Sequence, residues 1–69
     1  MLPPKEHLQT FLNKAVTIYM RKPVKYKGTL LDFDDHLNLK LESTYENEEF
    51  VGNIVLNGGS IAAIECAKD

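Results

Sequence analysis

Four acidic or histidine side chains fall within five consecutive residues of the chain, in the segment DFDDHLNL. They are Asp32, Asp34, Asp35 and His36. Carboxylates and an imidazole in such a cluster could bind a metal ion or serve as an acid–base pair. The same residues could instead form a solvated turn, or a pocket for a flat and polar ligand. The helices and strands that surround the segment determine which of these four possibilities applies: metal site, acid–base pair, solvated turn or ligand pocket.

The length and composition predict one small, folded domain over residues 1–69. The chain has 69 residues and 43% of them are hydrophobic, which is too many for a disordered segment. Its single cysteine, Cys66, cannot form an intrachain disulfide, and no spacing of Cys and His indicates structural zinc. We therefore expect no cofactor, and a small core that is well packed or supplemented by partner subunits.

The net charge of the chain is −2, with 8 basic and 10 acidic residues. A protein that coats duplex phosphates usually carries a positive excess, so this balance argues against such a protein. It does not argue against a protein that binds a few bases in a local pocket. Four of the eight basic residues fall within residues 21–27.

The hydropathy pattern gives no sign of a membrane segment. No apolar run approaches the roughly 20 residues that a membrane-spanning helix needs. The N-terminal residues Met-Leu-Pro-Pro and the polar residues after them do not resemble a signal peptide. These features favour a cytoplasmic protein, or a nuclear one if the source is eukaryotic.

Hydrophobic periodicity predicts a short helix followed by strands. An amphipathic helix is expected over about residues 4–13, because three apolar residues recur there at helical spacing, namely Leu8, Phe11 and Leu12. From about residue 15 to residue 65 the apolar residues alternate instead, which is typical of half-buried strands. Gly28 is followed by a slip in this alternation, so we expect a sharp bend there.

The last two strands carry consecutive apolar residues at 54–56 and 61–64. Such strands need cover on both faces, which a domain of this size cannot supply by itself. We expect a second copy to supply it, by pairing the fourth strand of one subunit with the fifth of the next in a contact that can close into a ring. The turn Asn57-Gly58-Gly59 is predicted to use glycine at φ > 0. The predicted fold is mainly β, with a short N-terminal helix and a strongly bent, five-stranded antiparallel small barrel.

Two stretches of the chain resemble the two motifs of the Sm/LSm family of RNA-binding ring proteins. The first stretch is VTIYMRKPVKYKGTLLDFDDHLNLKL, in which the matching positions are Gly28, Leu30, Phe33, Asp34, His36, Leu37 and Asn38. The second stretch is VGNIVLNGGSIAAIE. Together with the helix they cover nearly the whole chain.

The resemblance implies a hexameric or heptameric ring whose pore loops, at 34–38 and 57–59, bind single-stranded and often uridine-rich RNA in RNA processing or metabolism. The ring would consist of copies of this chain or include other Sm-like subunits. His36 would stack on a base, Asn38 would read its edge, and Asp34 would brace the loop. Asn57 and Gly58 would complete the RNA site.

Two positions depart from the family pattern. Family members with strong uridine binding have Arg-Gly where this chain has Asn57-Gly58, so the cation that would cover the base is missing. Lys22-Pro23 replaces the usual glycine-rich turn after the first strand. The first departure supports an alternative function, a structural or assembly ring with weak or no RNA binding.

A third hypothesis, a metal-dependent hydrolase, would use the four clustered residues of the DFDDHLNL segment. Strand alternation leading into a turn would scatter their side chains, and the sequence shows no second ligand cluster and no nucleophile–base arrangement. We therefore expect neither an enzyme nor a metal site, and solvated side chains at Asp32 and Asp35. Two alternatives stay open. Asn38 either holds its loop or reads a base, and Tyr19 and Tyr26 either pack in the core or an interface or stack on RNA outside the pore.

Overall fold

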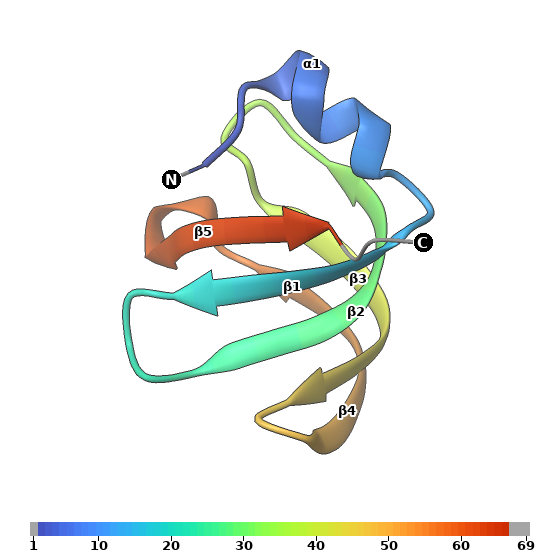
Figure 1. Cartoon of the computed structure of the whole chain (residues 1–69), viewed down its shortest axis with the longest axis vertical. Coiled ribbons are helices and arrows are strands. Elements are labelled where there is room, and N and C mark those ends of the chain that lie inside the picture. Colours follow the sequence, from blue (N-terminus) through green and yellow to red (C-terminus); the bar gives the residue numbers. More distant parts are fainter. Residues whose placement is uncertain (1, 67–69) are drawn as a thin grey trace.

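The computed structural model describes residues 2–66 and contains one five-stranded antiparallel sheet that curls strongly (Figure 1). The strand order is β4-β3-β2-β1-β5, so β4 and β5 are the two edges. The strands are β1 (Ala15–Met20), β2 (Lys25–Phe33), β3 (Leu39–Glu46), β4 (Glu49–Leu56) and β5 (Ile61–Cys66). The predicted fold class, a short helix followed by a bent five-stranded antiparallel sheet, is confirmed.

The N-terminal helix is shorter than the predicted span. Helix α1 covers Lys5–Leu8 and continues as one 3-10 turn, η1, over Gln9–Phe11. The chain leaves the helix because Asn13 adopts a left-handed conformation, with φ of 64°, and its N–H donates to the carbonyl of Leu30 at 2.7 Å. Leu8 is fully buried, and α1 covers one end of the curled sheet (Figure 1).

The core follows from strand alternation. In β1, Val16 and Ile18 are buried while Tyr19 is exposed, so alternate side chains point to the inside of the curl. Tyr26 of β2 is half-buried and packs against the core. The buried hydrophobic residues come from the helix and all five strands: Leu8, Val16, Ile18, Leu30, Leu39, Leu41, Leu56 and Ile61.

The predicted bend at Gly28 is present. The pairing of β2 with β3 shifts register twice, between Lys27 and Thr29 and between Leu30 and Asp32. A Cβ atom at Gly28 would lie 2.6 Å from the hydroxyl oxygen of Thr44, so only glycine lets the two strands approach this closely.

The polar segment 42–49 forms the outer ends of β3 and β4 and a short turn between them. Asn47 and Glu48 make this turn with positive φ values of 46° and 76°.

Among residues 2–66, the helices are too short to span a bilayer.

The two edge strands show apolar side chains on their outer sides. Val55 of β4 is 69% exposed, whereas Leu56 next to it is buried. In β5, Ile61 is buried and Ala62 is exposed. One chain therefore leaves these two apolar runs uncovered on one face, as the sequence pattern predicts.

Candidate nucleic-acid interface

A tight loop between β2 and β3 holds the Asp34 carboxylate at its centre. One carboxylate oxygen accepts hydrogen bonds from the backbone N–H groups of His36 and Asn38, at 2.9 and 3.0 Å. The backbone reinforces the loop, because the N–H of Leu37 donates to the carbonyl of Asp34 at 3.0 Å. Leu37 has a φ of 60°, so β3 begins at Leu39 rather than at Leu37 as the alternation predicts.

These hydrogen bonds favour the ionised form of Asp34. The bonds from Asn38, first from its backbone and then from its side chain, lower the pKa of the Asp34 carboxyl below its ordinary value. The N–H of His36 acts in the same direction. A carboxylate that accepts several N–H bonds suits a brace for a turn, because the charged form is the better acceptor.

Asn38 connects this loop to the turn between β4 and β5. Its side-chain NH₂ donates to the second carboxylate oxygen of Asp34 at 2.9 Å. Its side-chain oxygen accepts from the backbone N–H of Gly58 at 3.1 Å. Asn38 is half-buried, and its amide keeps one N–H and one oxygen lone pair that these two bonds do not use. The structural role of Asn38 therefore leaves room for a contact with a ligand.

The turn Asn57-Gly58-Gly59 differs from the prediction. Residues Gly58–Ser60 form a 3-10 turn, η2, and among the glycines in residues 2–66 only Gly52 has a positive φ. Gly58 is needed for a different reason, the close approach of another backbone. A Cβ atom there would lie 2.3 Å from the carbonyl oxygen of His36 and 2.6 Å from that of Leu37.

Asn57 caps this turn. Its side-chain oxygen accepts from the N–H of Gly59 at 2.8 Å, which satisfies one of the free donors at the start of the turn. Asn57 is exposed, like His36 in the facing loop. Among the hydrogen bonds of the described residues, none involves the His36 ring. A flat ring is therefore presented at the surface of a loop whose backbone is fixed.

Asp35 has a partner that the sequence does not reveal. We predicted a solvated side chain, and it is exposed, but it accepts a hydrogen bond from Lys5 of α1 and forms an ion pair with it. This bond is the main cause that lowers the pKa of the Asp35 carboxyl. Thirty residues separate the two side chains, so no local pattern could indicate the pair. Lys5 ties the helix to the loop.

The clustered acids do not converge on a common point. Asp32 accepts from the N–H of Phe33, whereas Asp34 bonds within its loop and Asp35 bonds with the helix. Within residues 2–66, no three side chains of His, Cys, Asp or Glu lie close enough together to hold a metal ion. The arrangement fits a braced loop with an exposed ring.

Comparison with known proteins places this fold in a family. A sequence model of the LSM domain matches residues 6–66. A Sm-like protein of Thermococcus sibiricus is 29% identical over 66 residues, which cover 88% of this chain and 87% of that protein. The chain belongs to the LSM-domain, or Sm-like, family.

Solved structures of Sm proteins have the same fold. The Sm protein of Pyrococcus abyssii, solved in complex with a uridine heptamer, superposes with a TM-score of 0.87 at 26% identity, over 94% of this chain and 99% of that one. The SmAP1 heptamer of P. aerophilum gives a TM-score of 0.87 at 28% identity, over 94% of this chain and 93% of that one.

Proposed function

We propose that this protein assembles into a closed ring of copies that binds single-stranded, uridine-rich RNA at the loops 34–38 and 57–60. The observation that carries the proposal is the amide of Asn38, which joins the two loops while His36 stays exposed beside it. Single-stranded RNA is recognised by stacking on flat side chains and by hydrogen bonds to base edges. This site offers both.

In the proposed complex, a uracil stacks on the His36 ring, and the unused N–H and lone pair of Asn38 face its edge. An amide supplies one donor and one acceptor, which match the carbonyl and N–H of uracil. Asp34 does not touch the RNA, and it positions His36 and Asn38 through the loop backbone. The uridine heptamer bound by the Pyrococcus abyssii protein supports uridine as the ligand class.

The ring is supported by the two sheet edges. Strands β4 and β5 are the edges, and Val55 on β4 is 69% exposed in the isolated chain. An exposed apolar edge strand invites pairing with another chain, and head-to-tail pairing of two different edges can close into a ring. The heptamer of P. aerophilum SmAP1 supports the same assembly here.

A second candidate function is a ring that serves as a scaffold and binds RNA weakly. Asn57 favours it, because its side chain is neutral and its oxygen is already bonded to Gly59. The net charge of −2 favours it as well. Both candidates are binding proteins of a single domain rather than enzymes. We place their work in RNA metabolism in the cytoplasm, where an unpaired cysteine such as Cys66 is stable.

Titration with oligo-uridine tests the proposal. His36→Ala should weaken binding by about 1–3 kcal/mol for each stacked base. The matched control is His7→Ala, which removes an imidazole from α1, where the ring packs against Phe11. Equal affinity of the wild type and His36→Ala, with the assembly intact by light scattering, would contradict the loop site. Equally weak binding by both would leave the scaffold function in its place.

A further inference from the structure

The outward side of the central strands carries lysines and tyrosines in neighbouring positions. Tyr19 of β1 lies directly opposite Lys25 of β2. Lys27, two residues further along β2, lies directly opposite Tyr45 of β3. Side chains directly opposite on one face of an antiparallel pair have Cβ atoms about 5 Å apart. We call these four residues the lysine–tyrosine face.

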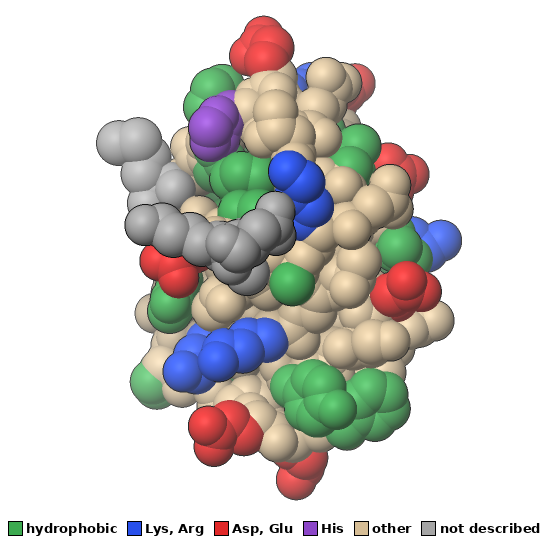
Figure 2. Space-filling view, turned by 45° about the vertical axis from the view of Figure 1, so that its right-hand side comes forward, with side chains coloured by type: hydrophobic (Ala, Val, Ile, Leu, Met, Phe, Trp, Pro, Cys, Tyr) green, Lys and Arg blue, Asp and Glu red, His purple; other side chains and the backbone are tan. Residues whose placement is uncertain are grey.

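Both tyrosine rings are available at the surface. Tyr19 is 40% exposed and Tyr45 is 46% exposed. Tyr45 is held in place by the ring of Phe50 on β4, which packs against it edge-on with centroids 5.2 Å apart. Figure 2 shows hydrophobic side chains gathered at the end of the molecule opposite α1, with a basic side chain extended beside them.

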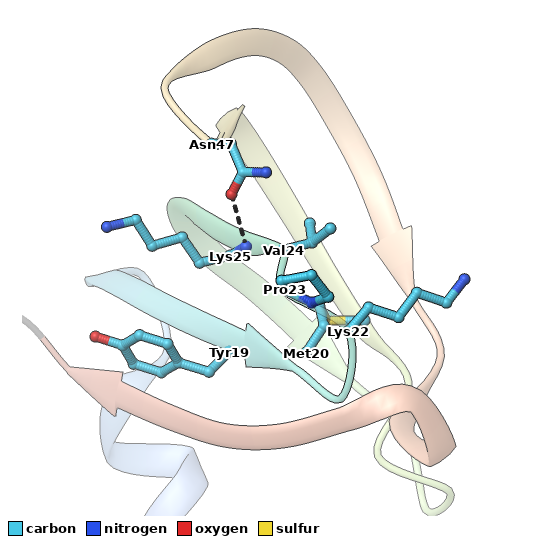
Figure 3. Close-up of a pocket in the computed structure, with 7 residues that line it drawn as sticks. All are labelled: Tyr19, Met20, Lys22, Pro23, Val24, Lys25 and Asn47. Carbon is cyan, nitrogen blue, oxygen red and sulfur yellow. Dashed lines mark hydrogen bonds between the residues drawn. The ribbon is translucent and has the colours of Figure 1, made fainter.

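The backbone of this face is fixed to the turn between β3 and β4. The side-chain oxygen of Asn47 accepts from the N–H of Lys25 at 3.0 Å (Figure 3). In the same view, the side chains of Tyr19 and Lys25 extend to one side of the β1–β2 hairpin, and Lys22 extends to the other. Tyr19 and Lys25 line a hollow of about 240 Å³, and Lys27 and Tyr45 line another of about 370 Å³.

The two ammonium groups of this face form no ion pair. Within residues 2–66 the single ion pair joins Lys5 to Asp35, so neither Lys25 nor Lys27 is neutralised by a carboxylate. Acids lie nearby in the register, but none forms an ion pair with either lysine: Glu65 across from Thr17, Glu42 across from Thr29 and Glu46 across from Tyr26. The face therefore presents two unpaired positive charges, each beside a flat ring.

We propose that the lysine–tyrosine face is a second site for single-stranded RNA, separate from the loops 34–38 and 57–60. Bases stack on Tyr19 and Tyr45, and backbone phosphates lie at Lys25 and Lys27. Aromatic rings beside basic side chains bind single strands of many sequences, because every base has a flat face. The face lies on β1, β2 and β3, the three inner strands of the sheet, so the pairing of β4 with β5 of the next copy does not use the backbone of these strands. The inference rests on the proposed function in taking RNA as its ligand.

The length of the RNA strand distinguishes binding at this site from binding at the loops. The double variant Lys25→Ala/Lys27→Ala should bind a uridine heptamer as the wild type does. It should bind a strand several times longer more weakly, and its salt slope should be smaller by up to about 0.7 for each phosphate that the variant no longer binds. The control is Lys14→Ala, which lies one residue before β1 begins. It should change neither the affinity for the long strand nor its salt slope.

Three results would overturn the proposal: unchanged binding of the long strand, an equal loss for the heptamer, or dissociation of the assembly by light scattering. The last would show that the face is a contact between copies. A wild-type protein that binds the long strand and not the heptamer would instead reject the loop site and leave this one standing.

Tyr19 provides a test of stacking itself. Tyr19→Phe keeps the flat ring and should keep the affinity for the long strand. Tyr19→Ala should lose at least about fivefold, the lower end of what one stacked base contributes. Equal losses in both variants would mean that the hydroxyl group, not the ring, makes the contact, and would contradict the proposed stacking.

Discussion

Asn57 stands where the family pattern has arginine, and the structure shows what this asparagine does instead. Its side-chain oxygen caps the η2 turn through the N–H of Gly59. Arginine cannot make this cap, so Asn57→Arg should lower the free energy of unfolding by about 1 kcal/mol. The same change should tighten oligo-uridine binding by about 0.5–2 kcal/mol per base, through a cation–π contact, and steepen its salt dependence.

Titrations of both proteins at several salt concentrations measure this gain, and chemical denaturation measures the loss of the cap. If the variant forms the same assembly and neither affinity nor salt slope moves, residue 57 does not face the RNA. The scaffold function would then be the better description of the protein.

The Asp34 brace makes the loop sensitive to acid. The pKa of this carboxyl is lower in the folded protein than its ordinary value of 3.8, chiefly because of the bonds from Asn38. Its stabilising effect is therefore complete above that value and disappears as the pH falls through the lower, folded pKa. The melting temperature of Asp34→Asn should lie below that of the wild type near neutral pH, and the difference should shrink in acid.

Asp35→Asn is the control for the acid titration. The pKa of Asp35 is lowered too, but by Lys5. Loss of the Asp35 charge should therefore affect the attachment of α1 and leave the loop hydrogen bonds in place. If the difference in melting temperature between Asp34→Asn and the wild type persists far below pH 3.8, the charge of Asp34 is not what braces the loop.

Much of the candidate site is visible in the sequence, because most of it is local. Asp34, His36 and Asn38 lie within five residues, and acidic side chains commonly accept bonds from the N–H groups that follow them in a turn. The bond from Gly58 to Asn38 spans 20 residues, and the Lys5–Asp35 pair spans 30. Such contacts depend on how the sheet curls, and no local pattern encodes them. The RNA-binding roles themselves stay predictions.

The η2 turn lies in the loop 57–60 and packs against the loop 34–38, and its two glycines allow a matched test. A methyl group at Gly58 would collide with the backbone carbonyls of His36 and Leu37, which cannot rotate away. A methyl group at Gly59 would meet only the side-chain oxygen of Asn57, at 3.3 Å. Gly58→Ala should therefore cost about 1–3 kcal/mol of stability and weaken RNA binding, and Gly59→Ala should cost much less.

Thermal unfolding and oligo-uridine titration compare the two glycine variants. Equal effects of both would show that the loops are not held together at Gly58.

Strand positions follow the sequence more closely than turn geometry does. The alternation of Val16 and Ile18 places β1, and the slip after Gly28 marks the bend of β2, because both reflect burial on one face. The η2 turn differs from the prediction because glycine serves there for close approach, which looks the same in sequence as glycine for positive φ. The helix ends early because of a long-range bond between Asn13 and Leu30.

The molecule as a whole has one apolar strand at each edge of its sheet. Val55→Lys should break the closed assembly, because pairing would bury an unpaired charge. The fold of the single chain should survive, since Val55 is 69% exposed there. Ala15→Lys, on the inner strand β1, is the control. Light scattering at micromolar concentration measures the mass, and a Val55→Lys variant of unchanged mass would contradict assembly through this edge.

The packing of Gly58 beneath the His36 and Leu37 carbonyls also bears on the speed of binding. Two loops that already pack together in the free protein do not have to close around a ligand. The diffusional encounter of protein and RNA, rather than a rearrangement of the loops, then sets the association rate. Association should then rise linearly with RNA concentration, without the plateau that a slow conformational step imposes. Differences in affinity between one RNA and another would appear in how long each remains bound.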